Sequence, residues 1–313
     1  MTKKFNIVFP GQGSQSVTML ADLADVFPLV SETFQEASDA LGLDLWKMVQ
    51  QGPAEALNLT HNTQPAMLAA GISVWRVWCE QGGSQPELMA GHSLGEYSAL
   101  VAADSLGFSD AIKLVAERGR LMQEAVPKGE GAMAAILGLD DERVRELCAE
   151  AAESEVVEAV NFNSPGQVVV AGNRSAVDRM VALAKAGGAK RAVPLPVSVP
   201  SHCALMRPAA ERLARYLEGV EVKPPAIPII HNVTVGKAAT PDEIRGLLAQ
   251  QLHSPVRWAE TIQAMADNKA QYIIEAGPGR VLAGLCKRID RTVTGLALFD
   301  PASLEKAMET INA

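Results

Sequence analysis

The sequence predicts an α/β fold: a hydrolase-like domain with a mostly parallel sheet, and an inserted ferredoxin-like subdomain. Strand-like and helix-like runs alternate through the first 125 residues, which is typical of a parallel sheet with crossover helices. Between residues 130 and 196 the predicted order is strand, helix, strand, strand, helix, strand (βαββαβ), the order of a ferredoxin-like unit. We therefore assign residues 1–129 and 197–313 to a large α/β domain and residues 130–196 to the small subdomain.

Each element has a local signal in the sequence. The run FNIVFP (5–10) is predicted to be a buried strand that ends in a glycine-rich loop. A helix is expected to begin near Thr63 and to end at the Gly82-Gly83 stop signal. Glu87–Ala90 should end a second strand, and Leu94–Ala103 should form the next helix. By the same criteria, further strands are expected at 132–137, 156–163, 167–172, 189–195, 227–233 and 271–278, and further helices at 140–153, 174–188 and within 253–268.

Composition excludes several classes of function. The chain has 28 Lys and Arg against 36 Asp and Glu, a net charge of −8, so nucleic acid is not an expected partner. No run reaches about 18 uncharged apolar residues, so no membrane span is expected. The four cysteines form no C-x-x-C pair, which favours reduced thiols, a cytoplasmic location and no metal site of that type. We expect a monomer.

A serine between two glycines, Gly91-His92-Ser93-Leu94-Gly95, lies where the second strand is expected to turn into a helix. Glycine removes the Cβ atom where the backbone must bend tightly. The pattern is that of a nucleophile elbow, which places a hydroxyl at the end of a strand and at the N-terminus of a helix. Ser93 is therefore the candidate nucleophile.

Two glycine-rich loops, in FPGQGSQ (9–15) and EAGPGRVLAG (275–284), follow predicted strands. Neither matches the dinucleotide-binding template, because Ser16 and Leu282 stand where the third glycine is required. Each loop is either a tight turn or a loop that offers backbone N–H groups to an anion.

A serine nucleophile needs an imidazole within hydrogen-bonding reach. His92 precedes Ser93 on the turn and is expected to point away from the hydroxyl. His202 lies in the proline-flanked segment SVPSHCALM, and loops at element ends often carry catalytic groups. His202 is either this base or a packed or surface histidine. Cys203, next to it, is expected to be a small buried residue.

The helix expected between Ser109, its N-cap, and Pro127 carries an arginine on its apolar face. Arg120 lies on the charged face, whereas Arg118 shares its face with Leu114, Val115, Leu121 and Met122. Arginine is rarely buried without an anionic partner. Arg118 therefore makes a salt bridge with a core Asp or Glu, or it holds a substrate carboxylate in two parallel hydrogen bonds.

Several separated motifs together resemble the malonyl-CoA:acyl carrier protein transacylases of bacterial type II fatty-acid synthesis, from about Asn6 to Phe299. They are FPGQGSQ, TQPA, GHSLGEYSALVAA, ERGRLMQEA, NFNSPGQVVVAG, VPSHCALM, QLHSPVRW and EAGPGRVL, in the order of the family. The resemblance implies a hydrolase-like domain with a ferredoxin-like insertion and an active site between them, which agrees with the layout predicted above.

The resemblance also implies roles for individual residues. Ser93 would be the nucleophile, and His202 its general base and later its general acid. Arg118 would hold the free carboxylate of the malonyl group. The backbone N–H groups of Gln12 and Leu94 would form the oxyanion hole.

One further implied role separates this family from the α/β-hydrolases. The main-chain carbonyl of Gln251 would orient His202, where a hydrolase uses a carboxylate. Three other functions stay open: a serine esterase or thioesterase of the α/β-hydrolase type, a non-catalytic module that binds a carrier protein, and an acyltransferase of a polyketide or malonate-decarboxylase pathway.

The family's reaction is a ping-pong transfer that needs no cofactor. A coenzyme A thioester would donate the malonyl group to Ser93, and the phosphopantetheine thiol of acyl carrier protein would accept it. Carrier proteins of this pathway are acidic, so docking would need a local basic rim. The candidates, which are otherwise solvated surface charges, are Lys190, Arg191, Lys287, Arg288 and Arg291.

Overall fold

The computed structural model describes residues 3–197 and 199–313, and its strands form two separate sheets. The larger sheet has five strands in the order β7-β2-β1-β8-β9, and all neighbouring pairs are parallel. Its strands are β1 (Phe5–Phe9), β2 (Met89–Gly91), β7 (Ile229–Ile230), β8 (Tyr272–Ala276) and β9 (Thr294–Leu298). The predicted α/β class with a mostly parallel sheet is confirmed.

The smaller sheet is antiparallel, with the strand order β4-β5-β3-β6. Its elements follow in chain order as β3 (Gly131–Leu137), α8 (Asp141–Ala152), β4 (Val157–Ser164), β5 (Gln167–Asn173), α9 (Arg174–Ala186) and β6 (Arg191–Pro194). The predicted βαββαβ order is therefore present. The exact limits of the two domains, at 129/130 and 196/197, stay a prediction.

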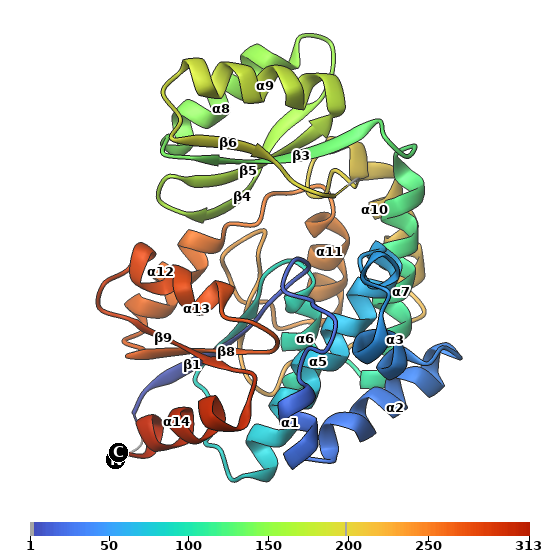
Figure 1. Cartoon of the computed structure of the whole chain (residues 1–313), viewed down its shortest axis with the longest axis vertical. Coiled ribbons are helices and arrows are strands. Elements are labelled where there is room, and N and C mark those ends of the chain that lie inside the picture. The colour runs from blue at the N-terminus through green and yellow to red at the C-terminus, as the bar shows by residue number, and fades with distance from the viewer. Residues whose placement is uncertain (1–2, 198) are drawn as a thin grey trace.

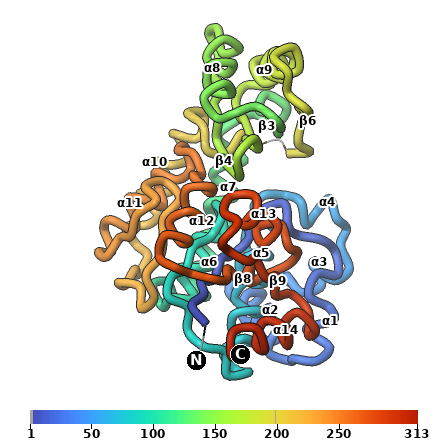
Figure 2. Tube along the Cα trace, turned by 90° about the vertical axis from the view of Figure 1, so that its left-hand side faces the viewer, coloured from blue at the N-terminus to red at the C-terminus, as the bar shows by residue number. Residues whose placement is uncertain are grey.

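The other helices belong to the larger unit. They are α1 (Ala21–Val26), α2 (Leu29–Leu41), α3 (Leu45–Gln51), α4 (Ala54–Leu57), α5 (Thr60–Glu80), α6 (Gly95–Ala102), α7 (Phe108–Ala125), η1 (Ala204–Met206), α10 (Arg207–Leu217), α11 (Pro241–Gln251), α12 (Trp258–Asp267), α13 (Val281–Ile289) and α14 (Pro301–Asn312). Figure 1 shows α8, α9 and the small sheet stacked above this unit. Figure 2 shows the same arrangement from the side, with α14 near the opposite pole, where the main-chain oxygen of Ile311 accepts from the Lys3 N–H at 2.9 Å.

Alternating side chains of β1 fill the cores on the two faces of the larger sheet, because successive side chains of a strand point to opposite faces. Phe5, Ile7 and Phe9 pack in the core that contains α2, α5, α6, α7 and α10. Val8 points the other way, into a core made with α12 and α13. The small sheet has its own core under α8 and α9, while Met133 on its opposite face packs near Cys203.

Parallel pairing brings the ends of several strands to one edge of the larger sheet. The segments that follow β1, β2 and β7 carry Gln12, Ser93 and Asn232, respectively. Residues far apart in the sequence therefore meet at this edge, below the small sheet.

Two predicted helix starts differ from the structure. The helix expected near Thr63 begins at Thr60. The prediction of Ser109 as an N-cap is wrong, because α7 begins at Phe108 and its N-cap is Gly107, whose backbone is extended. An N-cap needs this non-helical conformation, whereas Ser109 already lies within the first turn.

Candidate active site

Ser93 occupies a tight turn directly after β2, with a φ of 52°. The flanking glycines are required by crowding: a Cβ on Gly91 would lie 1.8 Å from the carbonyl carbon of Gly95, and a Cβ on Gly95 would lie 2.1 Å from the carbonyl oxygen of Phe9. The Ser93 N–H donates to Oδ1 of Asn232 at 2.7 Å. The turn is thus held tightly by its neighbours, while Ser93 itself stays partly exposed.

His202 lies against this hydroxyl, with its Nε2 2.8 Å from Oγ of Ser93. Its Nδ1 is 2.8 Å from the main-chain oxygen of Gln251. A carbonyl oxygen can only accept a hydrogen bond, so Nδ1 carries the proton and Nε2 is free to accept one from Ser93. Burial, and then the nearby Arg118 charge, lowers the pKa of His202 to about 3, which keeps the imidazole neutral.

Arg118 is buried on α7, at 1% exposure, and its side-chain hydrogen-bond partners among the described residues are all neutral. Its Nη1 donates to Oε1 of Gln64 at 2.8 Å, and its Nη2 donates to Oε1 of Gln251 at 3.0 Å and to Oγ of Ser93 at 3.3 Å. Its Nε has no partner among the described residues. The structural salt bridge considered for Arg118 is therefore not formed within the described part of the chain.

A small cavity of about 120 Å³ connects these groups. Its polar wall includes Gln12, Ser93, Arg118 and His202, and its apolar wall comes from Met122, Met133, Leu195, Val197 and Val199. Met133 belongs to β3, so the cavity lies between the two sheets.

Gln12 and Leu94 border the cavity as the predicted oxyanion donors should. Among residues 3–197 and 199–313, the backbone N–H of neither residue has a hydrogen-bond acceptor. Both N–H groups are therefore free to bind an oxyanion, and their role stays a prediction.

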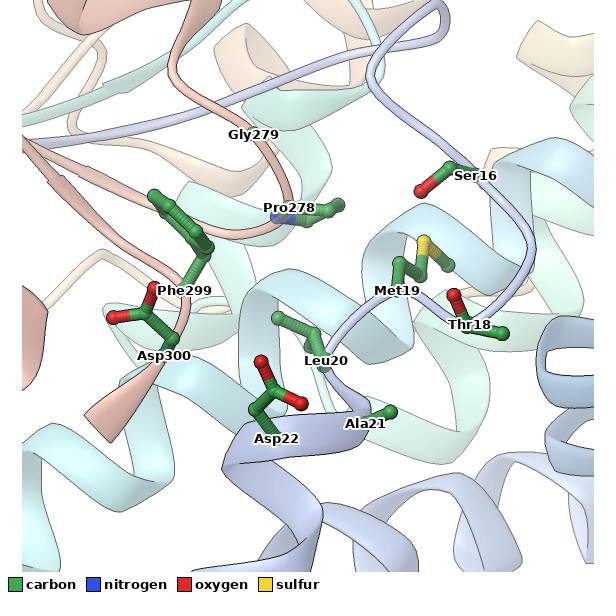
Figure 3. Close-up of a pocket in the computed structure, with 10 residues that line it drawn as sticks. All are labelled: Ser16, Thr18, Met19, Leu20, Ala21, Asp22, Pro278, Gly279, Phe299 and Asp300. Carbon is green, nitrogen blue, oxygen red and sulfur yellow. The ribbon is translucent and has the colours of Figure 1, made fainter. Parts of the chain in front are cut away.

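The second glycine-rich loop, at 275–284, does not line the cavity beside Ser93. Figure 3 shows Pro278 and Gly279 across from the N-terminal loop, around a pocket of about 490 Å³ that Asp22 and Asp300 also line. Two carboxylates at its border disfavour an anion there. Gly277 and Gly279 have φ angles of 140° and 85°, so this segment fits the tight-turn interpretation.

The structure also shows the surroundings of three other residues discussed above, His92, Cys203 and Arg120. Nε2 of His92 lies 2.8 Å from Oδ1 of Asn163, so His92 points away from the Ser93 hydroxyl as expected. Cys203 is fully buried. Arg120 pairs with Glu117 and Glu124 on the exposed face of α7.

Sequence reasoning missed a buried polar network beneath the site. The Glu96 carboxylate accepts from Nδ1 of His231 at 2.8 Å, from the N–H of Asn232 at 2.9 Å and from Nε2 of Gln251 at 2.9 Å. One signal was available, because Glu96 is the single charged residue in the apolar helix segment GEYSALVA. The reasoning that singled out Arg118 applies equally to this glutamate.

The described residues contain neither a metal-binding cluster nor a membrane-spanning helix. No group of three or more His, Cys, Asp or Glu side chains there could hold a metal ion. No helix in the described ranges is both long and apolar enough to cross a lipid bilayer.

The chain is similar to known proteins over almost its whole length. The acyl transferase domain family matches residues 7–295. The malonyl CoA-acyl carrier protein transacylase of Escherichia coli (strain K12) is 56% identical over 306 residues, which cover 98% of this chain and 99% of that protein.

Solved structures agree with this similarity. The malonyl CoA-acyl carrier protein transacylase of Coxiella burnetii is 49% identical and superposes with a TM-score of 0.99, covering 100% of this chain and 99% of that one. A malonyl-transacylase solved in complex with its type II PKS acyl carrier protein is 56% identical, with a TM-score of 0.97 and coverage of 98% and 100%.

Proposed function

The chain belongs to the acyl transferase domain family, and on this premise we propose that it transfers a malonyl group from malonyl-CoA to the phosphopantetheine thiol of acyl carrier protein, supplying fatty-acid synthesis. The relatives named above carry out malonyl transfer, and one was solved with its carrier protein. The reaction is a ping-pong acyl transfer with a malonyl-serine intermediate.

One observation carries the choice of acyl group. The Arg118 guanidinium lies 3.3 Å from the Ser93 hydroxyl, is bound only to neutral groups and keeps a buried Nε without a partner among the described residues. A buried cation without an anion is costly, so an acyl group that brings its own carboxylate is favoured there. Malonyl has such a carboxylate beside the reacting carbonyl, and acetyl does not.

In the first half-reaction, Oγ of Ser93 attacks the thioester carbonyl and its proton passes to Nε2 of His202. The N–H groups of Gln12 and Leu94 stabilise the oxyanion that forms on the carbonyl oxygen. The C–S bond then breaks, and the departing coenzyme A sulfur takes the proton from His202. The product is a malonyl ester of Ser93.

In the second half-reaction, the pantetheine thiol gives its proton to His202 and attacks the ester carbonyl. The same N–H groups stabilise the oxyanion, and Oγ of Ser93 leaves with the proton from His202. Both thiols are carried on the same phosphopantetheine arm, so one site serves both steps. Throughout, the Gln251 carbonyl holds the proton of Nδ1 and so fixes the imidazole.

Every step in this scheme is assigned to a group of the chain or of a substrate, so the proposed reaction calls for no cofactor. We place the reaction in the cytoplasm, because the four cysteines are free thiols, three of them buried, as is common for proteins of a reducing compartment.

We also propose where the carrier protein docks. Two basic clusters that are distant in the sequence, Lys190-Arg191 and Arg288, line one groove between the small sheet and α13. Nη1 of Arg288 donates to Oε1 of Gln167 at 2.9 Å and so links the two units at this groove. An acidic carrier would meet a local positive rim here, despite the net charge of −8.

Intact mass spectrometry tests the proposal. Protein mixed with malonyl-CoA should gain one malonyl group, and Ser93→Ala should gain none. Adding holo acyl carrier protein should remove the group from the enzyme and add it to the carrier. Free malonate without an adduct would instead indicate a hydrolase, and no adduct at all would indicate a binding module.

The two alternatives are an esterase of the α/β-hydrolase type and an acyltransferase of a polyketide pathway. A hydrolase triad needs an acid at Nδ1 of the base, and Nδ1 of His202 meets the Gln251 main chain, which weighs against an esterase. A polyketide acyltransferase would run the same reaction with another carrier, as the solved complex illustrates. The mass experiment with a fatty-acid and a polyketide carrier protein separates these two.

A further inference from the structure

In the part of the chain that the structure describes, the buried charges of the active site do not form a direct ion pair. Arg118 is 1% exposed, and within the described ranges its guanidinium binds only Gln64, Gln251 and Ser93. A guanidinium cannot lose its proton under ordinary conditions, so its charge must be compensated in some other way.

A second buried charge, the fully buried Glu96 in the first turn of α6, lies one side chain away. The amide of Gln251 connects the two: Oε1 accepts from Nη2 of Arg118 at 3.0 Å, and Nε2 donates to Oε2 of Glu96 at 2.9 Å. The second proton of Nε2 goes to the main-chain oxygen of Ser93 at 3.0 Å. The amide therefore has its oxygen toward the cation and its NH₂ group toward the anion.

The donors around Glu96 show that it is an ionised carboxylate. Arg118 can only donate, which fixes the Gln251 oxygen on its side and the NH₂ group on the side of Glu96. The Asn232 N–H is also an obligate donor to Glu96. These two donors are on Oε2. On Oε1 lies Nδ1 of His231, which carries the ring proton because Nε2 has no acceptor among the described residues, so the carboxylate acts only as an acceptor.

His231 does not cancel the charge of Glu96. Its Nδ1 lies 2.8 Å from Oε1 of Glu96, while its Nε2 is buried without a partner among the described residues. A protonated His231 would leave a charged N–H buried and unsatisfied, which is more costly than a neutral ring with an unused lone pair. The pair therefore keeps one net negative charge.

We propose that Glu96 is a positioning residue that acts as the counter-charge of Arg118, held one amide away so that the guanidinium stays stabilised and yet free for the acyl carboxylate. This inference rests on the proposed malonyl transfer. Burial lowers the pKa of Arg118, and the negative charge of Glu96 is among the effects that oppose this shift.

The substitution Glu96→Gln isolates the charge. The glutamine oxygen can keep the donors Asn232 and Gln251, and its NH₂ group can donate to Nδ1 of His231 once that ring moves its proton to Nε2. The protein then loses the anion and keeps these hydrogen bonds, while Nε2 of His231 gains a neutral N–H that has no partner among the described residues. Because Glu96 repels the acyl carboxylate that Arg118 attracts, its neutralisation should lower the KM for malonyl-CoA, by roughly tenfold, and leave acetyl-CoA within about twofold.

Two further variants complete the test. Glu96→Asp keeps the charge but shortens the side chain, so it should not lower the KM for malonyl-CoA. Glu275→Gln removes another fully buried carboxylate, which accepts from the Ala283 N–H and does not line the cavity, so it should leave the malonyl-to-acetyl ratio unchanged.

Thermal unfolding gives a readout that is independent of activity. Glu96→Gln should lower the melting temperature more when Arg118 is present than in an Arg118→Met background, where no buried cation needs compensation. Equal destabilisation in both backgrounds would overturn the proposal. This cycle stays decisive even if the single variant is too unstable for kinetics.

Different results would contradict the proposed malonyl transfer and the proposed role of Glu96. If the wild-type protein forms no malonyl adduct, the proposed function itself is wrong. If the wild type forms the adduct while Glu96→Gln raises the KM for malonyl-CoA and slows acetyl-CoA equally, then Glu96 has only a structural role and the counter-charge inference is wrong.

Discussion

The proposed choice of substrate rests on the surroundings of one residue, Arg118. Its neighbours are two glutamine oxygens and the serine hydroxyl, and the ring of Tyr97 lies 5.3 Å from its guanidinium carbon. None of these neutralises a full positive charge. A site built in this way gains most when the ligand itself supplies the missing anion.

Removing the guanidinium should therefore change substrate selectivity more than reactivity. We expect Arg118→Ala to lower kcat/KM for malonyl-CoA by about a hundredfold or more, the loss of a buried charge-assisted contact, and to lower that for acetyl-CoA much less. Rates of adduct formation by rapid-quench mass spectrometry measure both. Arg120→Ala, two residues further along the same helix on its exposed face, is the matched control and should leave both rates unchanged. An unchanged malonyl preference in Arg118→Ala would refute the assignment.

His202 should behave as a neutral base over the whole physiological range. Burial and the Arg118 charge lower its pKa from the ordinary value of 6.5 to about 3. The base is then unprotonated from pH 5 to 8, and the acylation rate constant should be flat over that range, with no inflection near pH 6.5. An inflection there that disappears in a His202 variant would contradict this expectation.

The same shift predicts a pH dependence of stability. Between pH 6.5 and 3 the unfolded chain binds a proton at this histidine and the folded chain does not, so stability should fall as the pH falls through this window. His202→Gln should show a shallower fall in urea unfolding than the wild type. An equally steep fall in both proteins would show that other groups set the acid limit.

At the scale of elements, the nucleophile turn depends on how closely β1, β2 and α6 approach one another. Gly95 opens α6 and packs against the end of β1, where its Cα has no room for a side chain. Gly246, in contrast, lies exposed within α11, and nothing lies within 4 Å of the Cβ that it lacks.

These two glycines should respond to alanine with opposite signs. Gly95→Ala would place a Cβ 2.1 Å from the Phe9 oxygen and 3.0 Å from the Pro10 oxygen, and should destabilise the protein by about 2 kcal/mol or more. Gly246→Ala should stabilise it by about 0.5–1 kcal/mol, because glycine costs conformational entropy inside a helix. Urea unfolding at constant pH measures both. Similar effects of the two changes would show that crowding at the turn is not the reason for glycine there.

The sequence predicted elements well where the pattern is long or chemically marked. The strand-turn-helix around Ser93 and the βαββαβ unit are examples, because each combines periodicity with glycine or turn signals. It missed the N-cap of α7, where an extended glycine backbone takes the place of a side-chain cap. It also made no prediction for α1 to α4. Three of them, α1, α3 and α4, have only four to seven residues, and α2 has no side-chain cap at its N-terminus.

At the scale of the molecule, the site is a product of assembly. Ser93, Gln12 and Asn232 follow different strands of one sheet, Arg118 and Gln251 belong to helices, and Met133 comes from the other sheet. Sequence motifs identified most of these residues one by one. The Glu96–Asn232–Gln251 network was missed because its members are far apart in the sequence and meet only once α6, β7 and α11 are packed.

Assembly also creates the groove that should receive the carrier protein. Lys190 directly precedes β6, Arg191 is the first residue of that strand, and Arg288 lies in the last turn of α13. Together the three side chains line a groove of about 720 Å³. Docking of an acidic protein on such a surface should weaken as salt screens the charges, whose reach falls from about 30 Å at 0.01 M to about 3 Å at 1 M.

The acceptor step should therefore depend on salt and on this groove only when the acceptor is a protein. Starting from preformed malonyl-enzyme, transfer to acyl carrier protein should slow by about tenfold or more over that salt range, and transfer to a small neutral thiol should not. Arg288→Gln should slow only the protein acceptor, whereas Lys223→Gln, an exposed charge outside the groove, should slow neither. Equal salt sensitivity with both acceptors would place the effect in the chemistry, and an unaffected Arg288 variant would place docking on another face.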